Sequence, residues 1–225
     1  MMRIDIITAV PDLLDSPLKT SIINRAQDKG KVKIKVHNLR DYAYDKHKQI
    51  DDKAFGGGPG MILKPEPFFE CIEKLVKDRK YENIIFTTPK GKIFNQSIAN
   101  KFSLANNIII IAGHYKEIDD RVREYFATDE ISIGNFVLTG GELPALIIID
   151  AVIRLIPGVL NDSEAALMDS FQNGEIVESP YYTRPAEYRG MKVPKVLLSG
   201  NEKDIKKWKE EQSKILTNKW RDYNK

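Results

Sequence analysis

A run of four consecutive isoleucines, Ile108–Ile111, restricts the fold of this chain more than any other feature. A second continuous apolar run, Ile84–Phe86, comes before it. Strands that face water on one side alternate apolar and polar residues, so continuous runs indicate strands covered on both faces. Helical patterns lie between and after these runs, from Gln96 under a predicted cap at Asn95 and over 119–126. The alternation predicts an α/β domain built on a parallel sheet.

The N-terminal part continues this pattern. A β-branched run over 2–10 predicts a first strand, apolar spacings over 13–23 predict one or two helical segments before Gly30, and 32–36 alternates as a half-exposed strand. The stretch 39–60 is charged and ends in Gly56-Gly-Gly-Pro-Gly60, which predicts a loop that is either disordered or functional. A helix is predicted to begin at Pro65.

Three loops follow strands of the predicted sheet, over 87–91, 113–115 and 134–141. The last belongs to a strand, glycine loop and helix unit over 131–158, whose helix opens with Glu142 and Pro144. Ligands of open α/β sheets gather at the carboxyl ends of strands, and glycines let bare backbone approach them. The loops therefore predict a small-molecule pocket; the alternative interpretation is a tight strand-to-helix connection.

Composition excludes several classes of protein. The 225 residues contain one cysteine, Cys71, so no disulfide can form within the chain, and its apolar neighbours predict a buried thiol. No signal peptide and no long apolar span is recognisable, which predicts a cytoplasmic protein. The three histidines are far apart and no metal-ligand spacing occurs, so no metal ligand is assigned. Walker, G-x-S-x-G and G-x-G-x-x-G sequences are absent.

The C-terminal part has a different character. The stretch 161–174 lacks a sustained apolar face and predicts a domain boundary, and a helix capped near Asn201 follows it. From Arg189 to Lys225 eleven basic residues stand against five acidic ones, a net charge of +6. Such a balance is typical both of a nucleic-acid-binding surface and of an ordinary solvated face.

An ordered series of motifs extends through nearly the whole chain. By these motifs the chain closely resembles bacterial tRNA (guanine-N1)-methyltransferases, which belong to the SPOUT class. The matching residues are Arg40-Asp41, Asp45, His47, Asp51-Asp52, Gly56–Met61, Gly113, Tyr115, Ile118-Asp119, Ser132–Gly134, Leu138, Gly140–Ala145, Ile156–Leu160, Asp169–Phe171, Tyr182–Pro185 and Val196–Asn201.

The resemblance implies a parallel α/β sheet with a deep trefoil knot, a rare exception to unthreaded chains, followed by a small helical domain. It implies a methyltransferase domain over 1–160, a linker over 161–174 that carries the catalytic aspartate, and a tRNA-binding domain over 175–225. The family is a homodimer in which each pocket is completed by the other subunit. The methyl donor S-adenosylmethionine is expected at Thr88, Pro89, Gly113, Tyr115, Ile133, Gly134, Asn135, Phe136, Val137, Leu138, Gly140, Gly141 and Pro144.

The substrate implied by the resemblance is tRNA, methylated at N1 of the guanine immediately 3′ of the anticodon. The family assigns the general base to the position of Asp169 and the stabilisation of O6 to that of Arg154. Arg154, Gly58 and Arg184 are the expected substrate contacts. From the residues alone, Arg154 fits an i, i+4 ion pair with Asp150 and Asp169 fits a helix cap.

One departure from the family pattern bears on metal use. The family reads Gly-Arg/His-Tyr-Glu-Gly-Ile-Asp, whereas this chain has Lys116 in place of the glutamate and Glu117 one position later. That glutamate is connected with Mg²⁺ dependence in the family, so a role for Mg²⁺ does not carry over directly. Lys116 also motivates an alternative, a tRNA-binding protein with a decayed methyl-donor pocket. Another target, such as ribose 2′-OH, fits the intact 169–171 motif less well.

Overall fold

The structure is a computed structural model that describes residues 1–161 and 169–224, and its contacts divide the chain into two units, Met1–Asn161 and Asp162–Lys225. The first unit is built on a five-stranded sheet in the order β2-β1-β6-β5-β8, with every neighbouring pair parallel. This confirms the predicted α/β class and parallel sheet. The strands are β1 (Met2–Thr8), β2 (Val32–Asn38), β5 (Asn83–Ile93), β6 (Asn107–Ala112) and β8 (Asp129–Ser132).

The isoleucine run forms the middle of β6, the central strand, and none of its members is more than 1% exposed. Ile108 and Ile110 pack into one core layer, and Ile109 and Ile111 pack into the other. The alternation of side chains along a strand thus feeds both faces. Phe102 and Phe68 fill the two layers, and burying a side chain of this size contributes roughly 1.5–3 kcal/mol.

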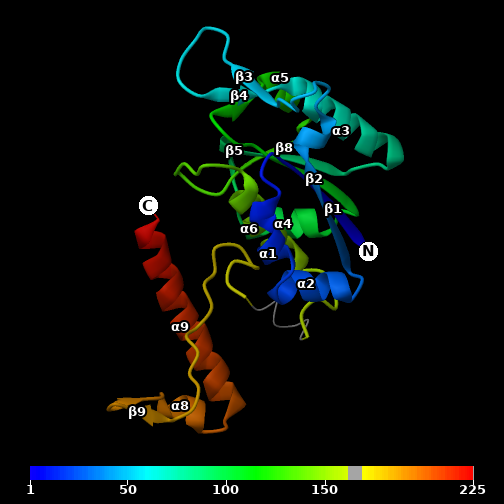
Figure 1. The fold of residues 1–225 in the computed structure, drawn as a ribbon. Coiled ribbons are helices and arrows are strands. Elements are labelled where there is room, and N and C mark those ends of the chain that lie inside the picture. Colours follow the sequence, from blue (N-terminus) through cyan, green and yellow to red (C-terminus); the bar gives the residue numbers. More distant parts are fainter. Residues whose placement is uncertain (162–168, 225) are drawn as a thin grey trace. The chain divides into compact units, whose positions relative to one another are not determined.

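Helices cover both faces of the sheet (Figure 1). One layer holds α1 (Asp12–Leu18), α2 (Ser21–Asp28), α4 (Gln96–Ser103) and α6 (Glu142–Ile153). The other holds α3 (Pro65–Asp78) and α5 (Asp120–Phe126). The Asn95 side chain accepts the Ile98 N–H at 3.0 Å, which confirms the predicted cap of α4. Cys71 is fully buried in the α3 layer, as predicted.

A second, three-stranded sheet has the order β3-β4-β7, formed by β3 (Asp51–Lys53), β4 (Met61–Leu63) and β7 (Glu117–Ile118). The sequence predicts only a loop over 39–60, yet the 3-10 helix η1 (Leu39–Tyr42) and β3 lie within it. The sequence pattern could not reveal these two elements. Elements of three or four residues are too short to display a period.

Strand β5 contains an irregularity beside the predicted pocket. Thr87 and Lys92 both pair with Ile131 of β8, so residues 88–91 form a bulge between them. Pro89 lies in this bulge and has no N–H to give to a sheet. The loop predicted over 87–91 is therefore a bulge within β5, which continues to Ile93.

The second unit contains the hairpin of β9 (Glu187–Tyr188) and β10 (Met191–Lys192), the short α8 (Lys195–Leu198) and the long α9 (Glu202–Tyr223). Asn201 caps α9 by accepting the Lys203 N–H at 3.2 Å. The segment before the hairpin packs along α9: Val177 donates its N–H to Thr217 Oγ1 at 3.0 Å, and its carbonyl accepts from Ser213 at 2.6 Å. Across residues 1–161 and 169–224, no helix combines the length and apolarity that crossing a bilayer requires.

Candidate active site

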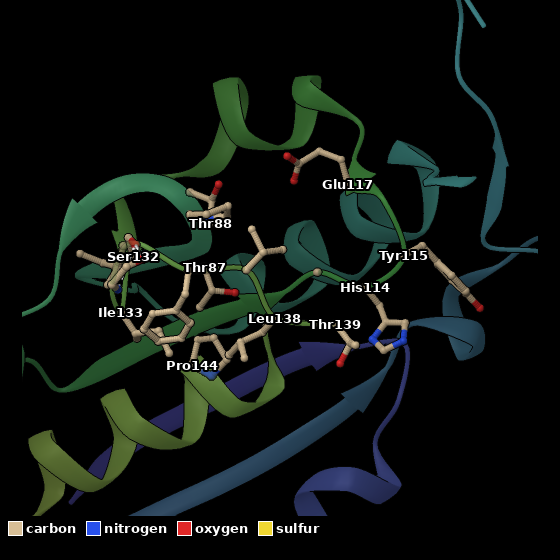
Figure 2. Close-up of a pocket in the computed structure, with 18 of the residues that line it drawn as sticks. Thr87, Thr88, His114, Tyr115, Glu117, Ser132, Ile133, Leu138, Thr139 and Pro144 are labelled. Carbon is tan, nitrogen blue, oxygen red and sulfur yellow. Dashed lines mark hydrogen bonds between the residues drawn. The ribbon is translucent and has the colours of Figure 1, made fainter. Parts of the chain in front are cut away.

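A cavity lies at the carboxyl end of the sheet, and its walls are the bulge within β5 and the loops that follow β6 and β8 (Figure 2). The empty space between these walls, open solvent included, is about 710 Å³. The lining is largely apolar around the last loop and polar around residues 113–117. The lining residues are Thr87, Thr88, Pro89, Gly113–Glu117, Ile131–Gly134, Phe136–Gly141 and Pro144.

The cavity brings together the residues that the sequence predicts for the methyl donor. All of them except Asn135, which is exposed, line this one space. Thr87, His114 and Thr139 of the predicted pocket loops also line it, as do Lys116, Glu117, Ile131 and Ser132, and none of the seven was assigned to the donor. Each is next in sequence to a predicted residue or to another of these, so the order of the loops is the only signal that could have found them.

Gly141 fixes the distance between two of the loops. Its N–H donates to the carbonyl of Gly113 at 2.7 Å. A Cβ at this position would lie 2.2 Å from Thr87 Oγ1 and 2.9 Å from the Cα of Ala112. Both contacts are shorter than real Cβ contacts, so only glycine lets the start of α6 approach β5 and β6 this closely.

A buried polar chain lies behind one end of the cavity. Glu142, the first residue of α6, is 1% exposed and accepts a hydrogen bond from Thr8 Oγ1 at 2.6 Å. Its other oxygen lies 3.5 Å from Nδ1 of His114. Figure 2 shows His114 and Thr139 together at this end, with the ring of Tyr115 directed away. A buried carboxylate thus lies directly behind His114, which lines the cavity.

The charges at the rim are exposed or half-buried. Lys90 Nζ lies 2.8 Å from Glu117 Oε2, and the hydrogen bond to this carboxylate raises the pKa of the lysine. Lys116 is exposed and contacts the glycine loop, since a Cβ on Gly60 would lie 2.9 Å from its own Cβ. The structure therefore brings the loop that carries Gly58 next to the cavity rim. In the described ranges, no three His, Cys, Asp or Glu gather in a way that could hold a metal ion.

The predicted catalytic residues lie in different units. Arg154 is the C-cap of α6, half-buried, and its N–H donates to the Asp150 carbonyl at 3.4 Å. Asp169 lies in the second unit, where its carbonyl accepts the Gln172 N–H at 3.4 Å. Arg184 is exposed in the same unit and precedes Pro185 through a cis peptide bond. Residues 162–168 of the predicted linker lie outside the described residues.

A parallel α/β sheet with a glycine-walled cavity at its carboxyl edge defines a small-molecule-binding α/β protein. The sequence profile of the family "tRNA (Guanine-1)-methyltransferase TrmD" matches residues 2–223, so the chain belongs to this methyltransferase family. A tRNA (guanine-N(1)-)-methyltransferase of Chlorobaculum tepidum is 54% identical over 216 residues, covering 96% of this chain and 94% of the relative. Enzymes with the same name from Bacteroides fragilis and Flavobacterium johnsoniae are 52% and 55% identical, covering 98% and 93% of this chain and 97% and 92% of theirs.

Proposed function

We propose that this protein transfers a methyl group from S-adenosylmethionine to N1 of the guanine immediately 3′ of the anticodon in tRNA. Membership in the family supports the reaction class and the substrate. The observation that carries the proposal at the level of the site is the single cavity that unites the predicted donor loops.

The residues of the cavity fit this donor. The close approach of Gly141 to Thr87 brings unsubstituted backbone to the wall, which suits recognition of a purine through N–H and C=O groups. Ile133, Leu138 and Pro144 provide apolar surface for a flat ring. When bound, S-adenosylmethionine supplies a methyl group on a sulfonium, which reacts with a nucleophilic nitrogen.

The protein's own residues must deal with the proton of guanine N1, which is present at neutral pH. We assign its removal to Asp169 as general base, because a carboxylate within hydrogen-bond reach can accept it. Negative charge then develops on O6, and we assign its stabilisation to the guanidinium of Arg154. Gly58, in the loop beside the cavity rim, and Arg184 are the further proposed contacts with tRNA.

The proposal includes the finer architecture implied by the resemblance. Residues 1–160 would form the knotted methyltransferase domain, 161–174 the linker that carries Asp169, and 175–225 the tRNA-binding domain. The charge of 189–225 supports contacts with phosphates. A homodimer with active sites at the subunit interface is supported by exposed large apolar side chains in the last cavity loop and on α6, since Phe136 is 54%, Val137 84% and Ile147 48% exposed.

Methyl transfer from labelled S-adenosylmethionine to a tRNA transcript with two guanines at the anticodon edge tests the proposal. We expect 1-methylguanine from the wild type, and none from Asp169→Asn or from a transcript that lacks the target guanine. The reaction run with and without Mg²⁺ shows whether Lys116 has changed metal use. Tight binding of tRNA without any product would instead support the tRNA-binding protein with a decayed pocket.

A further inference from the structure

A buried series of polar side chains, Thr8, Glu142 and His114, reaches the wall of the cavity and is separate from the roles proposed for Asp169 and Arg154. Glu142 is 1% exposed, and within residues 1–161 and 169–224 no lysine or arginine forms an ion pair with it. Its desolvation is compensated only in part, by the positive end of the α6 dipole and by the hydroxyl of Thr8, because no lysine or arginine balances the charge. Its position directly behind the wall makes the negative charge a candidate for a role in the cavity.

The hydrogen bonds show which partner faces which oxygen. The hydroxyl of Thr8 accepts the N–H of Val10 at 2.9 Å and donates its proton to Glu142 Oε1 at 2.6 Å. Glu142 Oε2 faces His114 Nδ1 at 3.5 Å, and this nitrogen is buried without a hydrogen-bond partner. A proton on Nδ1 would point to the carboxylate, and in that tautomer Nε2 is an acceptor.

Gly140 keeps the carboxylate close to the cavity. It lines the cavity and forms an isolated antiparallel bridge with His114. A Cβ on Gly140 would lie 2.2 Å from Glu142 Oε2 and 2.6 Å from His114 Nδ1. The absence of a side chain therefore allows the carboxylate and the imidazole to meet directly behind the wall.

We propose that the Glu142–His114 pair is the cation-selecting element of the donor cavity, favouring the sulfonium methyl donor over the neutral thioether that remains after methyl transfer. This inference rests on the proposed function, because it assumes that the cavity binds S-adenosylmethionine. The two ligands differ by one methyl group and one positive charge. Glu142 supplies a negative charge that water screens little, and His114 supplies an acceptor at the wall.

The other charges at the cavity act less strongly. Lys116 is exposed to solvent, and Glu117 is paired with Lys90 at 2.8 Å and retains 34% of its side-chain exposure. Charges of this kind are screened by water and salt. Glu117→Gln is consequently a matched control, since it removes a carboxylate that also lines the cavity without removing the buried one.

The test is calorimetric binding of S-adenosylmethionine and S-adenosylhomocysteine to full-length wild type, Glu142→Gln and Glu117→Gln, with thermal melting to verify folding. For Glu142→Gln we expect the affinity for S-adenosylmethionine to fall about tenfold more than that for S-adenosylhomocysteine. Glu117→Gln should change the ratio of the two affinities less than about twofold. An equal loss for both ligands in Glu142→Gln would overturn the inference and leave Glu142 with a structural role.

A measurement on the wild type keeps the test independent of folding. If the buried pair sets the ratio of the two affinities, this ratio should be nearly constant between about 0.05 and 0.5 M salt, because buried charges are little screened. A ratio that shifts steeply with salt would assign selection to surface charges and overturn the inference. A wild type that binds neither ligand would refute the proposed function itself, which is a distinct result.

Discussion

At the scale of a single residue, Gly141 determines the shape of the cavity that we propose binds the methyl donor. We expect Gly141→Ala to weaken S-adenosylmethionine binding at least about tenfold and to cost about 1–3 kcal/mol of stability, because its methyl group would enter the space of Thr87 and β6. Calorimetry and thermal melting measure the two effects. Gly30→Ala is the control: it has a positive φ and open space around it, so stability alone should fall. Unchanged donor affinity in Gly141→Ala would contradict this account of the cavity.

Arg154 provides a second prediction at this scale. If its guanidinium stabilises charge on O6, Arg154→Ala should lower the rate of the chemical step about 100-fold or more and leave donor affinity unchanged. Single-turnover methylation and donor binding separate the two quantities. Asp150→Asn is the control for an ion pair between neighbours on α6, and it should leave the rate of chemistry near the wild-type value. A loss of donor binding in Arg154→Ala that equals the loss in rate would assign the arginine to the support of the cavity.

At the scale of elements, the strands and helices whose residues show a period could be predicted from the sequence. The run at 108–111 identified the central strand, and Asn95 identified the start of α4. The strands β3, β4 and β7 could not be predicted, because two or three residues display no period and their pairing joins segments far apart in the chain. The loops of the cavity could be predicted because they follow recognisable strands. The contact of Glu142 with Thr8 could not, because it joins segments far apart in the chain. That contact joins β1 to α6 across the fold.

The attachment of α9 in the second unit gives an element-scale prediction. Thr217 is 6% exposed and accepts the N–H of Val177, so Thr217→Val would leave that N–H unsatisfied at a cost of about 1–3 kcal/mol. We expect faster hydrogen exchange at the Val177 amide. Thr217→Ser keeps the hydroxyl and should preserve most of the protection. Equal exchange in the wild type and Thr217→Val would show that this hydrogen bond does not hold the segment on α9.

At the scale of the whole molecule, a buried carboxylate couples stability to pH. Burial raises the pKa of Asp5, but hydrogen bonds from Arg3, His37 and Tyr81 outweigh it and hold the pKa well below its ordinary value. A lowered folded-state pKa gives stability that is present above the unfolded-state pKa of about 4 and is lost as the pH falls below it. We expect Asp5→Asn to cost about 3–5 kcal/mol at neutral pH and to make the loss of stability below about pH 4 less steep. Urea unfolding between about pH 3 and 7 measures both effects, and parallel curves for the two proteins would contradict the prediction.

Shared active sites would also be a property of the whole assembly. Arg154→Ala and Asp169→Asn should each be nearly inactive, but if the two residues of one site come from different subunits, coexpression should restore about a quarter of the wild-type sites. Half of the dimers formed at random are mixed, and each mixed dimer has one intact site. The measurement is the methylation activity of the coexpressed pair. The control is a mixture of the two separately purified variants under conditions in which subunits do not exchange. Complete inactivity of the coexpressed pair would place each site within one subunit.

Helix α6 has Gly141 and Glu142 at the cavity end and Arg154 at the other, and buried residues such as Ile149 hold its middle in the core. At 1.5 Å per residue, its twelve residues form a rod of about 18 Å. Because the helix is rigid over this length and packed at its middle, a displacement of one end is accompanied by a displacement of the other. A substitution that shifts the cavity end of α6 would therefore also shift Arg154, which is proposed to contact the guanine. Selection for binding of the methyl donor and selection for reaction with RNA would then act on the same helix. Evolution of donor affinity and of RNA chemistry would then be mechanically linked in this protein, even where no residue serves both.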